Sequence, residues 1–113
     1  MEKEKTTLLQ ELDDIKKRCS KRNWIESEPV SEGTLKHARD FILWLQKNSM
    51  HPEISAEPDG EIAFDWFEKE GMFSISISGM KRFAYADTRP TFHNNGYINH
   101  EDLYTEIKKR NLS

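Results

Sequence analysis

Residues 61–78 contain two runs of strictly alternating apolar and polar residues around a short turn. Six large apolar side chains fall on one side of these runs: Ile62, Phe64, Trp66, Phe73, Ile75 and Ile77. Successive side chains of a strand point to opposite faces, so a period of two predicts an antiparallel β-hairpin with one buried and one wet face. A two-stranded hairpin is marginal in water, so other elements must cover the apolar face.

Three helices are expected around this hairpin. Residues 2–22 lack Gly and Pro and carry an apolar stripe at helical spacing. Residues 33–48 follow Ser31, a suitable N-cap, and repeat apolar residues at three- and four-residue steps, so this helix is expected to cover the hairpin. A last helix from His100 to about Arg110 is expected to have Asn99 as its N-cap.

The remaining strands are shorter. Residues 54–57 suit a short strand before the turn Pro58-Asp59-Gly60, residues 82–86 keep the period of two, and residues 91–93 suit a short edge strand. The sequence therefore predicts an α+β fold: a three- or four-stranded antiparallel β-meander packed on one face by a central helix, with N-terminal and C-terminal helices at its edges. Residues 1–22 form the charged N-terminal helix, and residues 23–113 form a single α+β domain.

The stripe of the first helix consists of Leu8, Leu12, Ile15 and Cys19. It either docks on its own domain or pairs with another chain as a short coiled-coil seam. Fewer than two heptads are too short for an independent coiled coil, so we expect a monomer or a weak homodimer.

Composition and length indicate one domain in the cytoplasm. The chain has 113 residues, 35% of them hydrophobic and 33% charged. Its single cysteine, Cys19, excludes an internal disulfide. Apolar runs are too short to span a bilayer, and the first ten residues lack the apolar segment of a secretory signal, so we expect no membrane contact.

Charge is distributed unevenly along the chain. The formal net charge is −3, but residues 50–80 carry seven acids against Lys69 alone. Such an acidic hairpin would repel phosphate, which argues against direct nucleic-acid binding. Lys81, Arg82 and Arg89 form a smaller basic cluster, expected to be solvated or paired with Asp87.

Patterns for catalysis are missing from the sequence. The four histidines lack metal-ligand spacing, no Gly-x-Ser-x-Gly elbow surrounds a serine, and the five glycines are scattered at turns. We therefore expect no enzyme, no metal and no cofactor. The alternative is a small hydrolase or metal-assisted enzyme whose site assembles from His51, His93, Asp65 and Glu53.

The wet face of the sheet is the better functional candidate. The residues expected to bind a partner there are Glu57, Asp59, Glu61, Ala63, Asp65, Phe67, Glu68 and Glu70. They would dock a basic protein such as a nuclease or effector, with Phe67 as an anchor. The chain would then be a protein-interaction module with the role of an inhibitor or antitoxin. The alternative is a solvated acidic face without a partner.

Residues 30–86 also resemble a family of small uncharacterised bacterial proteins. In that family an N-capped Ala/Phe-rich helix precedes a Pro-x-Ile segment, a Pro-Asp-Gly turn and a meander with one Trp. The matching residues are Val30, Ser31, Ala38, Phe41, Leu45, Pro52, Ile54, Pro58, Asp59, Gly60, Glu61, Ile62, Trp66, Phe73, Ile75 and Tyr85. The family has no assigned activity, so the resemblance implies the fold and an association with toxin, defence or phage functions, and it implies no chemistry.

Overall fold

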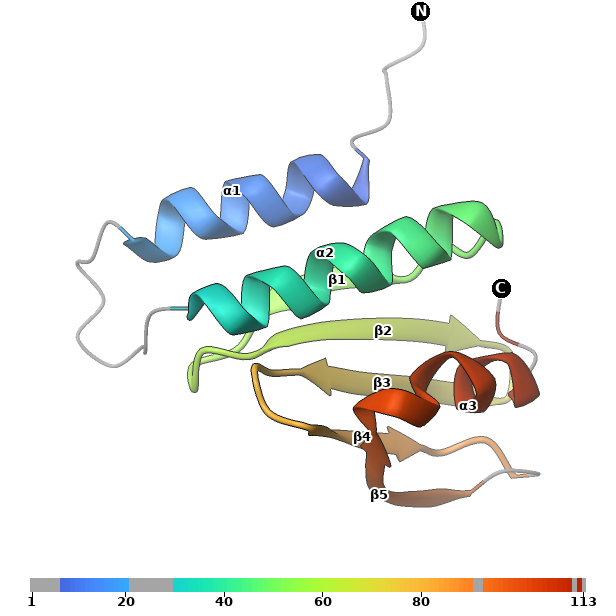
Figure 1. Ribbon diagram of the computed structural model, residues 1–113. Coiled ribbons are helices and arrows are strands. Elements are labelled where there is room, and N and C mark those ends of the chain that lie inside the picture. The colour runs from blue at the N-terminus through green and yellow to red at the C-terminus, as the bar shows by residue number, and fades with distance from the viewer. Residues whose placement is uncertain (1–6, 21–29, 91–92, 111, 113) are drawn as a thin grey trace, which may run out of the picture.

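The computed structural model describes residues 7–20, 30–90, 93–110 and 112, with only the backbone of residues 18–20. Its elements are α1 (Leu8–Ser20), α2 (Glu32–Lys47), β1 (Glu53–Ala56), β2 (Ile62–Glu68), β3 (Gly71–Ile77), β4 (Arg82–Asp87), β5 (Asn94–Asn99), the 3-10 turn η1 (His100–Asp102) and α3 (Leu103–Lys109). The three helices lie on the same side of one sheet (Figure 1). The predicted α+β class is confirmed.

The sheet is an antiparallel meander of five strands in the order β1-β2-β3-β4-β5. The prediction of three or four strands was therefore wrong. Residues 91–92 lie outside the described residues, and the last strand begins at Asn94 rather than at residue 91. It pairs with β4 along its whole length, from Arg82 opposite Asn99 to Asp87 opposite Asn94.

Helix α2 covers the apolar face of the hairpin, as its sequence pattern predicts. The Ser31 hydroxyl accepts a hydrogen bond from the Thr34 amide at 3.1 Å, which satisfies one of the free N–H groups at the start of the helix. Phe41 is fully buried and meets the ring of Phe64 edge-to-face, with 5.0 Å between centroids. All six inward residues of β2 and β3 belong to the same core cluster as α2.

Helix α1 uses its stripe inside its own chain. Leu12 and Ile15 are buried in the core cluster shared with α2 and the sheet, and Leu8 packs against it. Docking on the parent domain is thus the arrangement that the structure shows, and pairing of two chains through this stripe would require α1 to leave its place. The Cys19 side chain lies outside the described residues.

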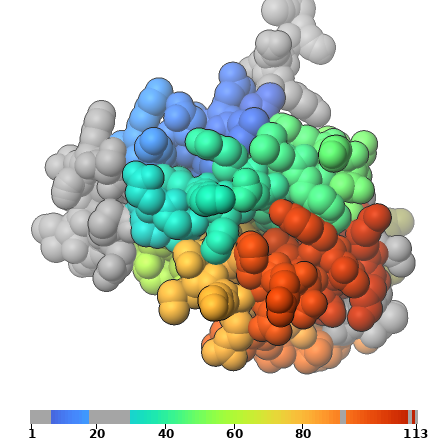
Figure 2. Space-filling model, in the orientation of Figure 1, coloured from blue at the N-terminus to red at the C-terminus, as the bar shows by residue number. Residues whose placement is uncertain are grey.

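The C-terminal helix starts later than its sequence suggests. His100 begins a 3-10 turn, and α3 follows from Leu103. Asn99 occupies the N-cap position before His100, as predicted, but its side chain makes no capping hydrogen bond. Leu103 and Ile107 are buried and fasten α3 to the core. Figure 2 shows α2 and α3 side by side over the sheet as a continuous layer of side chains.

Candidate docking face on the sheet

The sheet has one face that no described helix covers (Figure 1). We call it the open face. Strand register places these residues on it: Glu53, Ser55, Ala63, Asp65, Phe67, Met72, Ser74, Ser76, Arg82, Ala84, Ala86, Asn95, Tyr97 and Asn99. Alanine and serine side chains fill its centre.

Carboxylates gather on one half of this face and beside it. We call Glu53, Glu57, Asp59, Glu61 and Asp65 the acidic half; they come from β1, β2 and the turn between these strands. Asp65 lies opposite Glu53 on β1 and opposite Ser74 on β3. The acidic half is therefore built by neighbouring strands and does not depend on a mobile tail.

Two serines of β3 orient these carboxylates. The Ser74 hydroxyl donates a short hydrogen bond to Asp65, and the Ser76 hydroxyl donates to Glu57 Oε1 at 2.9 Å. Each bond draws an acidic side chain across the sheet toward β3. The negative charge therefore lies along the open face.

The turn before β2 brings three carboxylates close together, and Glu57 is one of them. One oxygen each from Glu57, Asp59 and Glu61 lies within 4.8 Å of the others. The backbone holds this arrangement, because the Glu57 amide donates to the Glu61 carbonyl at 2.8 Å. Burial raises the pKa of Glu61, and the neighbouring charges of Asp59 and Glu57 raise it further.

Two apolar residues predicted for the face have opposite exposures. Ala63 is only 5% exposed, because Ser55 and Ser76 flank it on the neighbouring strands. It cannot serve as the apolar centre of a contact. Phe67 is 62% exposed at the far end of β2, so it is the apolar group that remains available.

Glu68 and Glu70 lie in a different environment from the rest of the predicted set. Glu68 is the last residue of β2 and is half-buried, and Glu70 is exposed in the turn that follows. The hydrogen bond to Asp87 raises the pKa of Arg89, and the charges of Glu68 and Glu70 raise it further, so Arg89 offsets part of their charge. The acidic residues predicted to bind a partner therefore form two groups: those of the acidic half, and Glu68 and Glu70, whose charge Arg89 partly offsets.

The other half of the open face carries no carboxylate and one positive charge, that of Arg82. The Arg82 guanidinium lies 4.7 Å from the centroid of the Tyr97 ring, a cation–π contact between β4 and β5. Asn95 and Asn99 stand on either side of Tyr97 along β5. Negative charge on the open face thus decreases from β1 toward β5.

Two residues of the alternative enzyme site lie together, Asp65 opposite Glu53, but its two histidines are far apart. His51 precedes β1 and His93 precedes β5, which are the two edge strands of the sheet. Four strand spacings of about 4.8 Å separate these edges, so the two imidazoles cannot share one substrate or ion. Asp65 lies opposite Glu53 on the open face, with both histidines exposed elsewhere.

A buried charged cluster was missed by the sequence reasoning. Asp87 is 2% exposed and accepts hydrogen bonds from Arg89 and Arg110. Pairing of Arg89 with Asp87 is confirmed, but Arg89 is buried rather than solvated. The sequence contains a signal for the burial of Asp87. Phe83, Tyr85 and Asp87 alternate along β4 and so lie on the same face, and the first two face the core.

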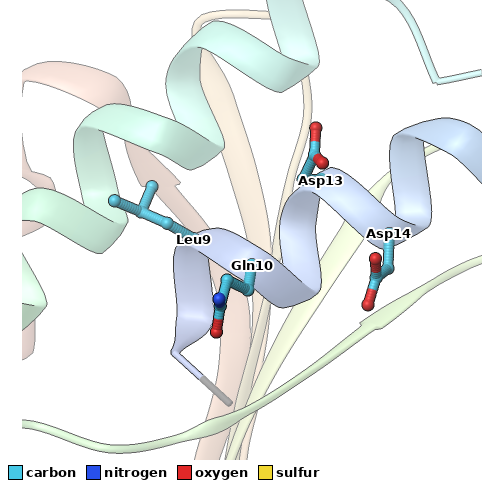
Figure 3. Close-up of a pocket in the computed structure, with 4 residues that line it drawn as sticks. All are labelled: Leu9, Gln10, Asp13 and Asp14. Atoms are coloured by element: carbon cyan, nitrogen blue, oxygen red, sulfur yellow. The ribbon is translucent and has the colours of Figure 1, made fainter.

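The hollow drawn in Figure 3 lies beside α1 and away from the acidic half. Leu9, Gln10, Asp13 and Asp14 line it, all from a single helix. Because it contains no residue of the predicted site, it does not contribute to the open face.

Comparisons with protein-family models, with curated proteins and with solved structures found no match. The predicted family resemblance therefore stays a prediction, and the functional argument rests on the geometry of this chain. In the described residues, no helix has the length and apolar character needed to cross a membrane.

Proposed function

We propose that this protein is an interaction module that docks a basic protein through the acidic half of its open face. The observation that carries the proposal is the uncovered sheet face with carboxylates held across it by Ser74 and Ser76. Such preformed hydrogen-bonding geometry favours a partner with Lys and Arg side chains, because it reduces the entropy lost on binding.

Charge complementarity supports a basic partner over a neutral one. Closely spaced carboxylates on one half of the face attract a basic surface from a distance and orient it. The half around Asn95 and Tyr97 carries Arg82 and no carboxylate, so it exerts no such attraction and the partner approaches in one orientation. The same negative charge repels nucleic acid, and a partner that binds nucleic acid through a basic surface would be blocked by this contact.

Phe67 supplies the apolar part of the contact. It is 62% exposed and stands on the same strand and face as Asp65. Exposed aromatic rings near an interface centre often contribute most of the binding energy, while surrounding charges set orientation. The proposed role is therefore that of an inhibitor, with a nuclease or effector as the class of partner.

The test uses the full chain as bait in a host lysate, with captured proteins identified by mass spectrometry. The proposal expects a protein of high isoelectric point that is released as salt rises, since exposed charges are screened over about 10 Å at 0.1 M. Asp65→Lys and Phe67→Ala should each abolish capture. Capture that persists across a wide salt range would contradict the electrostatic part of the proposal.

Glu101→Lys is the matched control. It makes the same charge reversal as Asp65→Lys at an exposed residue of η1, on the helix side of the molecule. The proposal expects this variant to capture the same protein as the wild type. Equal loss with Glu101→Lys and Asp65→Lys would show that only net charge matters and that the open face has no special role.

A further inference from the structure

Strand β5 is an edge of the sheet without the usual protection against strand pairing. The strand order ends at β5, and among the described elements none lies beyond it (Figure 1). Its six residues, NNGYIN, include neither a charged residue nor a proline. Edge strands of soluble proteins usually carry Lys, Pro, a bulge or only a few residues, because their free N–H and C=O groups attract other strands.

The opposite edge, β1, is protected in several of these ways. It has only four residues, begins with Glu53 and follows Pro52. Helix α1 also contacts this strand. The lack of protection is therefore specific to β5 and not general to this sheet.

The direction of the free backbone groups follows from one hydrogen bond. The His100 amide donates to the Lys81 carbonyl at 2.7 Å, next to the pair Arg82–Asn99. Residues of an antiparallel strand alternate between bonding one neighbour and pointing to the other side. Asn95, Tyr97 and Asn99 consequently direct their N–H and C=O groups away from β4 and into the free edge.

The order of these three residues, Asn-Tyr-Asn at every second position, is the same in both directions along β5. Tyr97 lies at the centre, with an asparagine two residues before it and another two residues after it. An antiparallel second copy centred on Tyr97 would place Tyr97 opposite itself and Asn95 opposite Asn99. On the helix side, Gly96 would face Ile98 of the second copy, so the absence of one side chain accommodates the larger one.

Charge and exposure favour this pairing over others. The Tyr97 side chain is 65% exposed, and the strand has no charge that would repel an identical strand. Two-fold contacts between identical surfaces are the commonest route to a dimer. The acidic half lies on β1 and β2, about 14 Å or more from the edge at 4.8 Å per strand, so the two acidic halves do not meet.

We propose that the β5 edge binds a second copy of this chain, antiparallel about Tyr97, to give one continuous sheet from two five-stranded halves. The open faces of the two copies then lie on the same side. The acidic halves stand at opposite ends of this extended face, so the dimer presents two docking surfaces. The contact is a short strand pair, so association increases with protein concentration.

Sedimentation equilibrium of the full chain over a wide concentration range tests this dimer. The expected mass rises from 13.3 kDa toward twice that value as concentration increases. Tyr97→Lys places two like charges opposite each other on paired strands and should weaken association at least tenfold. A mass of one chain at every concentration would overturn the proposal.

Phe67→Lys is the matched control, since Phe67 is 62% exposed on the same face, three strands from the edge. It should associate like the wild type. Circular dichroism of both variants verifies that the fold is intact. Equal weakening by Phe67→Lys and Tyr97→Lys would overturn the proposal, because the contact would then not be centred on β5.

Cross-linking locates the contact independently of any loss of association. In a Cys19→Ser background, Tyr97→Cys should give a covalent dimer with a short bis-maleimide, because the two residues lie opposite each other. Phe67→Cys in the same background should stay monomeric. Equal cross-linking of the two variants, or none with Tyr97→Cys under conditions where the wild type sediments as a dimer, would overturn the proposed register.

Discussion

The Arg110 guanidinium donates a hydrogen bond from Nη1 to Oδ2 of Asp87 at 3.1 Å, and so ties the end of α3 to the end of β4. Arg89 bonds the same carboxylate and also donates to the Arg110 carbonyl at 3.0 Å. The planar face of Arg110 lies 4.7 Å from the Tyr85 ring centroid. One buried carboxylate thus organises the C-terminal part of the fold.

Replacing this carboxylate should destabilise the protein strongly. Asp87→Asn removes the carboxylate that two buried guanidinium groups share and leaves Arg110 only the longer ion pair with Glu106 at 3.8 Å; breaking a buried pair in this way costs about 3–5 kcal/mol of unfolding free energy. Urea unfolding followed by circular dichroism measures the loss. Asp65→Asn is the control on the open face, where the half-buried Asp65 accepts a hydrogen bond from Ser74 that contributes about 0.5–1.5 kcal/mol. Similar losses for the two variants would contradict the structural role of Asp87.

The same cluster makes stability depend on acid pH. Burial by itself would raise the pKa of Asp87, but hydrogen bonds and charge from Arg89 and a hydrogen bond from Arg110 outweigh it and lower the pKa below its usual value. A lowered pKa contributes stability that is present above the unfolded-state pKa of about 3.9 and is lost as pH falls through the folded-state value. The stability difference between wild type and Asp87→Asn should therefore narrow below about pH 4. A constant difference from pH 7 to pH 2 would contradict this.

Glu61 should contribute a pH dependence of stability with the opposite sign to that of Asp87. Its pKa is raised, so its charged form is disfavoured in the folded state, and stability falls as pH rises through the unfolded-state and then the folded-state pKa. Glu61→Gln should increase the free energy of unfolding at pH 7 by a few tenths of a kcal/mol, since partly exposed charges are screened by water. Thermal melts at pH 7 and at pH 3 measure this gain, which should vanish at pH 3. A gain of equal size at both pH values would show that charge is not its cause.

The cap of α2 gives a local test of the fold. Ser31→Ala removes the acceptor for the Thr34 amide and should lower the free energy of unfolding by about 1 kcal/mol. Ser55→Ala, at an exposed position of β1, should change it by less than about 0.5 kcal/mol. Urea unfolding of the two variants under the same conditions makes the comparison. A larger loss from Ser55→Ala would contradict the capping role of Ser31.

Elements with a strong local pattern could be predicted from the sequence. Strands β2 and β3 alternate strictly, and α2 begins at a serine cap, so the pairing of the two strands and the burial of their apolar face under α2 were expected. Strand β5 could not be predicted in the same way. Asn94, Asn95 and Gly96 disfavour strands, and pairing with β4 overrides that preference.

The candidate site was predictable to a similar extent. Alternation placed Asp65 and Phe67 on the wet face, and register confirms their side of the sheet. It could not show that Ala63 is covered, because that depends on the neighbouring strands. Contacts between distant segments could not be predicted either, such as the tilted ring contact of His37 with His100 at 4.5 Å between centroids.

The central claim is that the acidic half of the open face, rather than acidity in general, receives a basic partner. Its most direct test is amide chemical-shift mapping by NMR during titration of the 15N-labelled chain with a synthetic Lys/Arg-rich peptide. The account predicts that the largest shifts fall on Ser55, Asp65 and Ser74. Shifts centred on Asp13 and Asp14 of α1, or spread evenly over all acidic segments, would contradict it.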